Sequence, residues 1–374
     1  MNRATIAGAL ALAVVLGAVA PARTAESARV DAQGFRLALP PYEFAFPRDH
    51  AAHPDFQTEW WYYTGHLQSK SERFGYELTF FRVGLPRLRP QSPSAWAARD
   101  LIFLHLALTE ESRGRFRHHE SARRAAVGLA GADTTRYHVW LDDAFAGLDP
   151  DGVTHHVRGA GADFALDLQM RSEKLPTIHG EGGVSQKSTG RGHASHYYSL
   201  TRLATTGIVV KDGDTLRVEG PSWMDHEFAS NPMAATHAGW DWFSVQLDDG
   251  RELMLYQLRL KGGGVEPLSH GTLVARDGRT RGLRLADFSV EPTGRWTSPK
   301  TGAVYPSGWV LRVPSEKLVL TLEPTVNDQE LIASSMAGVV YWEGSVRVKA
   351  VSQDKPLGGV GYVELTGYTG RAPF

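Results

Sequence analysis

The chain has 374 residues, of which 40 are Lys or Arg and 41 are Asp or Glu, so its formal net charge is only −1. A balanced charge gives no overall field that would recruit nucleic acid or an anionic membrane, and partners of those kinds are not expected. The absence of cysteine excludes disulfides, thiolate chemistry and a lipid anchor on cysteine. The 10 Trp, 12 Tyr and 15 Phe are more informative, because aromatic side chains fill barrels and line pockets for apolar ligands.

The N-terminal segment, residues 1–22, is predicted to be a secretory signal peptide. It begins Met-Asn-Arg, continues without charge from Ala4 to Pro21, and has small residues at Ala20 and Ala22 that fit an Ala-x-Ala cleavage site. A transmembrane anchor is the competing interpretation, but the apolar run is short and rich in Ala, which favours cleavage. We therefore expect a periplasmic or secreted protein with no stable membrane span after processing.

Period-two alternation dominates the rest of the chain and is typical of half-buried antiparallel strands. From Phe74 to Phe80, aromatic or aliphatic residues alternate with Gly, Glu and Thr. Comparable patterns predict further strands, in chain order, at 101–108, 135–141, 163–170, 206–210, 309–314, 318–324 and 361–368. The best helix candidate begins after Asn327 or Asp328, either of which could cap a short helix carrying Leu331.

An internal similarity relates two parts of the chain. The segment from Glu59 (EWWYYTGHLQSKSERFGYELTFFR) is similar to the one from Gly239 (GWDWFSVQLDDGRELMLYQLR), and each ends in an arginine, Arg82 or Arg259. Chance similarity between two hairpins is the alternative, but duplication divides the mature chain into two similar lengths. We therefore predict an all-β fold of two tandem antiparallel β-barrels, or strongly bent sandwiches, with few short helices. The junction is expected between Asp212 and Trp240, and the predicted domains span 23–224 and 225–374.

Six segments in order carry a resemblance to a known family: 53–67 (HPDFQTEWWYYTGHL), 195–203 (SHYYSLTRL), 222–228 (SWMDHEF), 239–250 (GWDWFSVQLDDG), 341–344 (YWEG) and 361–368 (GYVELTGY). Together they resemble the AttH family of secreted proteins, often labelled secreted hydrolases. That family is similar in turn to the carotenoid 1,2-hydratases, also called hydroxyneurosporene synthases. The resemblance implies two tandem lipocalin-like barrels and relatives that act on long apolar substrates without a metal.

The resemblance also points to a reaction centre within residues 220–232 (GPSWMDHEFASNP). Carotenoid hydratases have an essential Asp, with nearby His, Trp and Tyr, in a motif that resembles Trp223, Asp225, His226 and Phe228 of this chain. The chain reads Met-Asp-His-Glu-Phe where the hydratases tend toward His-Asp-His-Asn-Trp. The central Asp-His pair is therefore retained, while the residues around it differ.

The chemistry expected of this segment is proton transfer. Hydration of an alkene needs an acid that can protonate carbon and a pocket that shelters a carbocation. A carboxylic acid kept neutral by apolar burial can be that acid, and aromatic faces can stabilise the cation. Asp225 is the predicted acid, with His226 beside it and Tyr197 or His196 as a second donor. The alternative is that Asp225 or His226 only bonds backbone amides at the crossover between domains.

The predicted substrate-binding residues are polar or aromatic side chains near these strands: Trp60, Trp223, Trp240, Trp242, His196 and Glu59. Glu59 and Glu343 each adjoin two aromatic residues and could place a carboxylate at a pocket mouth. A rim carboxylate paired with an arginine is the more frequent outcome for such a residue.

Other catalytic motifs are missing from the sequence. No Gly-x-Ser-x-Gly elbow of a serine hydrolase is found, and His226-Glu227-Phe-Ala-Ser departs from the zinc motif His-Glu-x-x-His. A catalytic metal is the less favoured alternative, and its nearest candidate ligands are His193, His196, His226 and His237. We predict no metal and no other cofactor.

Two functions remain open from the sequence. The first is an exported enzyme that uses Asp225 for metal-free hydration, isomerisation or hydrolysis of a hydrophobic substrate in an aromatic pocket. The second is a periplasmic carrier or sensor of a lipid or another hydrophobic ligand. Both predict an aromatic pocket, but only the enzyme needs an ionisable Asp225 that faces into it.

Overall fold

The computed structural model describes residues 29–87, 94, 96–230, 232–334 and 338–370, so the predicted signal peptide lies outside the described part of the chain. The helices in this part are four single 3-10 turns: η1 (Arg48–His50), η2 (Glu111–Arg113), η3 (Leu285–Asp287) and η4 (Pro314–Glu316). None of the described helices has the length and hydropathy that a membrane span requires. The predicted all-β class is confirmed, and every predicted strand overlaps an observed one.

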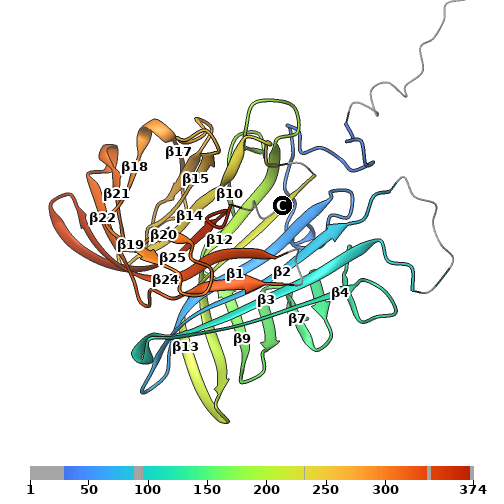
Figure 1. Ribbon diagram of the computed structural model, residues 1–374, viewed down its shortest axis with the longest axis horizontal. Helices are drawn as coiled ribbons and strands as arrows, with labels where there is room; N and C mark the ends of the chain where they lie inside the picture. Colours follow the sequence, from blue (N-terminus) through green and yellow to red (C-terminus); the bar gives the residue numbers. More distant parts are fainter. Residues whose placement is uncertain (1–28, 88–93, 95, 231, 335–337, 371–374) are drawn as a thin grey trace, which may run out of the picture.

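The first sheet is antiparallel and forms the blue-to-yellow part of Figure 1. Its strands lie in the order β4-β3-β2-β1-β13-β12-β9-β8-β7-β6-β5, and β10 and β11 pair with β12. Their bounds are β1 (Thr58–Gln68), β2 (Arg73–Gly84), β3 (Asp100–Glu110), β4 (Arg115–Arg124), β5 (Ala130–Ala132), β6 (His138–Leu141), β7 (Ala144–Leu148), β8 (Thr154–Ala160), β9 (Phe164–Ser172), β10 (Thr177–Ile178), β11 (Ser185–Gln186), β12 (Ala194–Lys211) and β13 (Asp214–Ala229).

The second sheet has the order β17-β16-β15-β14-β25-β24-β22-β21-β18, with β23 paired on β24. Its bounds are β14 (His237–Leu247), β15 (Glu252–Leu260), β16 (His270–Val274), β17 (Thr280–Arg284), β18 (Ser289–Pro292), β21 (Trp309–Val313), β22 (Leu318–Pro324), β23 (Glu330–Ala333), β24 (Val339–Ser352) and β25 (Lys355–Thr366). A small separate ribbon is formed by β19 (Arg295–Thr297) and β20 (Val304–Pro306).

The two sheets have the same connectivity, as the internal similarity predicted. In each, the first strand pairs with the second and also with the last: β1 with β2 and β13, and β14 with β15 and β25. Pairing of first with last strand bends each sheet into a nearly closed, lipocalin-like barrel. The chain passes from the first sheet to the second between Ala229 and His237, slightly beyond the predicted domain boundary at 224.

Side-chain alternation along β1 explains how one strand serves two cores. Trp61 and Tyr63 are buried inside the first barrel, whereas Tyr62 and the neighbouring Trp60 pack on the opposite face of the strand. That second face lies against aromatic residues of the other sheet, including Trp242. Because β1 is covered on both faces, its hydrophobic run is almost continuous instead of alternating with polar residues.

The predicted helix after Asn327 is wrong. Glu330–Ala333 forms β23, which pairs antiparallel with β24. The physical reason is that Leu331 and Ala333, two residues apart, both enter a core shared with Phe103 of the first sheet. A strand presents such residues on one face and a helix does not, so tertiary burial overrides the local capping signal.

Candidate functional site

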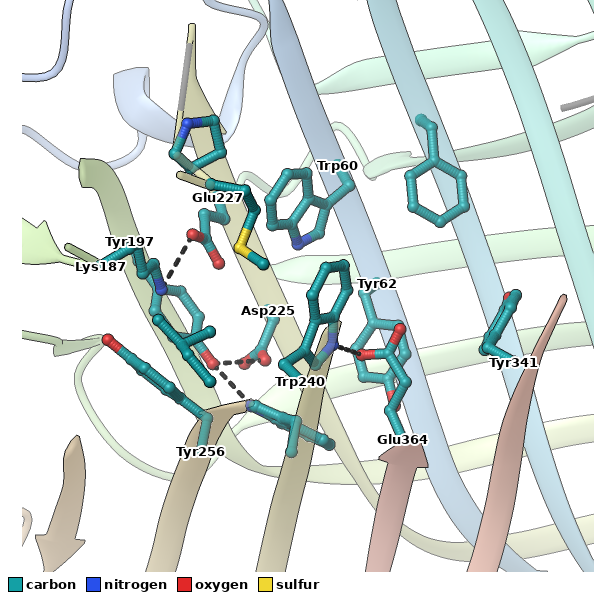
Figure 2. A pocket seen from close by; sticks show the side chains of 15 residues that line it. Trp60, Tyr62, Lys187, Tyr197, Asp225, Glu227, Trp240, Tyr256, Tyr341 and Glu364 are labelled. Carbon is teal, nitrogen blue, oxygen red and sulfur yellow. Dashed lines mark hydrogen bonds and ion pairs between the residues drawn. The ribbon is translucent and has the colours of Figure 1, made fainter. Parts of the chain in front are cut away.

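A cavity of about 80 Å³ lies between the two barrels, which is room for several water-sized groups (Figure 2). Both sheets contribute to its wall, together with the segments around Lys187 and Met233. Most of the lining is aromatic or aliphatic: Trp60, Tyr62, Phe81, Tyr197, Pro232, Met233, Trp240, Trp242, Tyr256, Leu258 and Tyr341. The carboxyl and amino groups among these walls belong to Lys187, Asp225, Glu227 and Glu364.

Strand β13 presents its polar residues to two different environments. Asp225 is opposite Tyr62 on β1 and Ser199 on β12, and it shares their face toward the second sheet. The next residue, His226, is opposite Trp61 and therefore points to the other face, where the two rings stack at 4.9 Å between centroids. The predicted Asp225-His226 pair is thus divided by the pleat of the strand.

Asp225 is almost fully buried, with 4% of its surface exposed, and it receives three hydrogen bonds. The indole of Trp223 donates to Oδ1 at 2.6 Å, the hydroxyl of Ser199 donates to the same oxygen, and the hydroxyl of Tyr197 donates to Oδ2 at 2.7 Å. Burial raises the pKa of Asp225 to about 7, an effect that these hydrogen bonds only partly offset. The carboxyl group can therefore carry a proton near neutral pH.

A chain of hydrogen bonds continues behind Asp225. Tyr197 accepts a bond from the indole of Trp242 at 3.0 Å, so its hydroxyl orientation is fixed from two sides. Ser199 is also bonded to Nε2 of His179 at 2.7 Å, and Nδ1 of His179 lies 2.8 Å from the hydroxyl of Thr272 in the second barrel. The predicted donor Tyr197 is thus placed directly on the predicted acid.

An ion pair occupies one end of the cavity. The ammonium group of Lys187 lies 3.1 Å from Glu227, and both side chains are largely buried. The same nitrogen lies over the rings of Tyr256, at 4.3 Å from the centroid, and Tyr197, at 5.0 Å. Burial alone would lower the pKa of Lys187, but the charge of Glu227 raises it, so this lysine stays protonated.

A second carboxyl group lines the cavity on the side of the other barrel. Glu364 of β25 accepts a hydrogen bond from the indole of Trp240 at 2.9 Å (Figure 2). Burial raises the pKa of Glu364 to about 7, and the charges of Asp225 and Glu227 act in the same direction. The adjacent Glu343 is fully buried and accepts a bond from Tyr62 at 2.8 Å, in place of the arginine partner expected for it.

His226 and Glu59 belong to a separate buried group, called here the Glu59 network and consisting of Asp49, His53, Glu59, Arg82 and His226. The Glu59 carboxylate lies 2.9 Å from Arg82 Nε, from His53 Nδ1 and from His226 Nε2. Burial alone would raise the pKa of Glu59, but the charge of Arg82 and the two histidines hold it well below its usual range. Glu59 is thus paired with an arginine as expected, although in the interior and not at a rim.

The Glu59 network has three potential ligand atoms close together, on His53, Glu59 and His226, all within 4.8 Å. Both histidine nitrogens are already hydrogen-bonded to the Glu59 carboxylate, and the guanidinium of Arg82 donates to the same carboxylate. A cation would have to displace those bonds and lie beside a permanent positive charge. The network is therefore better suited to holding the first barrel together than to binding a metal.

His196 is likewise outside the cavity. Its ring stacks on Tyr42 at 4.0 Å between centroids and packs near Phe228, on the face of β12 opposite Tyr197. Its Nδ1 lies 2.8 Å from the carbonyl oxygen of Gly183, and burial lowers the pKa of the imidazole to about 4. A neutral, packed imidazole on this face contacts none of the cavity residues described above.

Of the predicted site residues, the structure brings together Asp225, Tyr197, Trp60, Trp240 and Trp242 at the cavity. Trp223 lies directly behind Asp225 as its hydrogen-bond donor. The cavity-lining residues that sequence reasoning missed include Lys187, Tyr256 and Glu364. A signal existed for Glu364 alone, because the repeat that relates the two hairpins could have been extended to their partner strands.

Two nearly closed antiparallel barrels with an aromatic, carboxyl-containing cavity between them define a tandem lipocalin-like protein. The sequence profile described as AttH-like matches residues 37–368, and the chain belongs to this family. The family resemblance seen in the sequence is thus confirmed. Comparison with curated protein sequences finds no match.

Solved structures agree with this assignment. A protein assigned as AttH from Nitrosomonas europaea is 34% identical, with a TM-score of 0.80 over 89% of this chain and 99% of its own. Kievitone hydratase from Nectria haematococca has a TM-score of 0.67 at 13% identity, covering 86% of this chain and 92% of the hydratase. The protein CghA, solved with Sch210972, has a TM-score of 0.55 at 15% identity, covering 91% and 98%. The last two likenesses concern the fold alone.

Proposed function

We propose that this protein is an exported enzyme in which Asp225 protonates an unsaturated, largely apolar small molecule held between the two barrels. The observation that carries the proposal is the placement of a buried carboxyl group with a pKa of about 7 in the wall of an aromatic cavity. A general acid works best when its pKa is close to the working pH, and burial of Asp225 provides that match.

The residues around Asp225 suit this role. Trp223 provides a fixed N–H donor that orients the carboxyl group, while the hydroxyls of Tyr197 and Ser199 can rotate to follow its protonation state. Aromatic faces of Trp60 and Trp240 line the space where positive charge would develop on the substrate. The mostly apolar wall limits premature attack by bulk water on such a cation.

Hydration is the first reaction to test. One structural relative is named a hydratase, and its likeness to this chain concerns the fold. The choice of hydration therefore rests on the site, which has a protonatable acid and a second carboxyl group within one cavity. Isomerisation would need the same acid. The two reactions differ in their products, because hydration adds an oxygen atom from water and isomerisation does not.

A carrier or sensor of a hydrophobic ligand is the second candidate. It is favoured by the three hydrogen bonds that Asp225 accepts, because a carboxyl so well bonded could serve only to fix Trp223 and Tyr197. Replacement of Asp225 by Asn distinguishes the two functions. Affinity for the ligand is expected to be retained in both cases, so turnover is the measurement that separates them. An enzyme converts the ligand as wild type and loses that turnover in Asp225→Asn, whereas a carrier binds the ligand unchanged before and after the substitution.

The test is incubation of the purified mature protein in ¹⁸O-labelled water with unsaturated compounds, including kievitone, prenylated phenols and polyenes, followed by mass spectrometry. We expect one class of compound to gain labelled oxygen. Asp225→Asn is expected to reduce the rate by ~100-fold to ~10,000-fold, the usual contribution of a general acid. The matched control is Asp143→Asn, an exposed aspartate in the first barrel, which should leave the rate unchanged. Equal rates for wild type and Asp225→Asn would refute the proposal.

A further inference from the structure

Glu364 occupies in the second barrel the position that Asp225 occupies in the first. The two similar hairpins superimpose in sequence with Trp60 on Trp240 and therefore Tyr62 on Trp242. On the partner strand, Tyr62 is opposite Asp225 and Trp242 is opposite Glu364. The two carboxyl groups are thus equivalent by strand register, one on the last strand of each sheet.

This equivalence brings both groups to the same place. Asp225 enters the cavity from β13 and Glu364 from β25, on walls that belong to different barrels (Figure 2). Each carboxyl group accepts a hydrogen bond from an indole N–H, from Trp223 in one case and Trp240 in the other. Duplication of a barrel and burial of the equivalent faces against each other therefore produces a site with two fixed acids.

Apart from Asp225, Glu364 is the cavity carboxyl group that is available for proton transfer. Glu227 also lines the cavity, but its carboxylate is held in the ion pair with Lys187. Glu343, the neighbour of Glu364 across the β24–β25 pair, is bonded to Tyr62 and does not line the cavity. Glu364 is only half-buried, and the bond that holds it comes from a neutral indole.

We propose that Glu364 is a second catalytic residue, the general base that removes a proton from water while Asp225 acts as the acid, so that the cavity hydrates carbon–carbon double bonds. This inference rests on the proposed function of Asp225. In the reaction, the proton of Asp225 forms a new C–H bond with the π electrons of the alkene. Water oxygen then bonds to the adjacent cationic carbon and releases a proton to the Glu364 carboxylate. Proton exchange with solvent restores the protonated Asp225 and ionised Glu364.

The surroundings of Glu364 determine how this pair of groups titrates. The ionisable groups that face it are Asp225, Glu227 and Lys187 across the cavity, Tyr62 and Glu77 of the β1–β2 hairpin, and Tyr341 and Glu343 of β24. Apart from Lys187, which is already paired, these groups are acids, so they oppose ionisation of both carboxyls at once. Near neutral pH we therefore expect one of the two carboxyl groups to be protonated and the other to be ionised. The reaction requires this state, with the proton on Asp225.

The first test uses ¹³C NMR of the protein labelled at the glutamate side-chain carboxyl carbon, titrated with acid and base. We expect a resonance that titrates near pH 7 and is lost in Glu364→Gln. The control Glu343→Gln should retain that resonance. The apparent pKa of Glu364 can fall in this variant, because a neighbouring acid is removed. The inference is overturned if the resonance lost in Glu364→Gln titrates near the ordinary glutamate value of about 4.3.

The second test compares Asp225→Asn, Glu364→Gln and the double variant in the labelled-water assay. We expect each single change to lower the rate by at least ~100-fold, with the double variant little worse than either, because the two residues act in one reaction. Glu364→Gln is expected to abolish one side of a bell-shaped pH profile. Retained turnover in Glu364→Gln with loss in Asp225→Asn overturns the inference and leaves the proposed function intact. Retained turnover in both variants overturns the proposed function itself.

Discussion

Replacing Asp225 by Asn is expected to change how stability depends on pH. The wild-type carboxyl is buried and has a pKa of about 7 in the folded protein, whereas the unfolded chain has a value close to 3.8. Between these two values the folded protein holds a proton that the unfolded chain releases. The free energy of unfolding of the wild type therefore falls as pH rises through this window, and it stays lower above pH 7.

The size of this effect follows from the same shift. A rise from 3.8 to about 7 corresponds to about 4 kcal/mol, at ~1.4 kcal/mol per pKa unit. Asn has the same shape and stays neutral, so Asp225→Asn removes this dependence. We expect the free energy of unfolding of the variant, relative to wild type, to increase by about 4 kcal/mol between pH 4 and pH 9.

The assay is urea unfolding followed by tryptophan fluorescence at several pH values from 4 to 9. Glu77 titrates in both proteins without a contribution from Asp225, so it cancels in the difference between variant and wild type. The charge of Asp225 raises the pKa values of Glu343 and Glu364, so the difference reports Asp225 together with its coupling to these two neighbours. Asp143→Asn, at an exposed position, is the control and should give no pH-dependent difference. Parallel stability curves for Asp225→Asn and wild type would refute the claim that Asp225 is held neutral by burial.

Three further predictions concern the groups around this site. Trp223→Phe removes the indole N–H that stabilises the ionised form of Asp225, so the pKa of Asp225 should rise further, by about one to two units. NMR of labelled aspartate measures this pKa, and an unchanged value would contradict the assigned hydrogen bond. Glu59→Gln removes one of the two carboxylates paired with the buried Arg82, so that only Asp100, at 2.9 Å, remains as its ion partner. The change should reduce the free energy of unfolding by about 3 kcal/mol, with the affinity of a cavity ligand unchanged. Zinc added to the mature protein should leave the melting temperature unchanged, because the ligand atoms of the Glu59 network are already bonded; a clear rise in the melting temperature would show that they bind the ion.

The separation of Asp225 from His226 shows what alternation alone can determine. Adjacent residues of a strand point to opposite faces, so once the segment is taken as a strand, these two side chains cannot share one pocket. The same rule applies to Tyr197 and His196 on β12. The sequence thus contained the information that Asp225 and His226 point to opposite faces, as do Tyr197 and His196, although the motif made them look like one centre. That Asp225 and Tyr197 share a face follows from the pairing register of β12 and β13.

The helix predicted after Asn327 failed for a related reason. A local cap signal is worth about 1 kcal/mol, whereas burial of an aliphatic side chain such as Leu331 contributes about 2 kcal/mol or more. Which face of the segment becomes buried depends on its contact with Phe103 in the other sheet. No pattern within ten residues of Asn327 contains that contact.

The sequence by itself determined the all-β class, the duplicated barrel, the family and the central position of Asp225, because these depend on period-two alternation, internal similarity and motif order. Only the tertiary structure decided which faces meet. Asp225 and Glu364 line one cavity because the first and last strands of each sheet pair and the two barrels pack on their aromatic faces, and Lys187 enters the same cavity from the segment after β11. The pKa values of Asp225 and Glu364 follow from that packing, because burial, and not the type of residue, raises them toward neutrality.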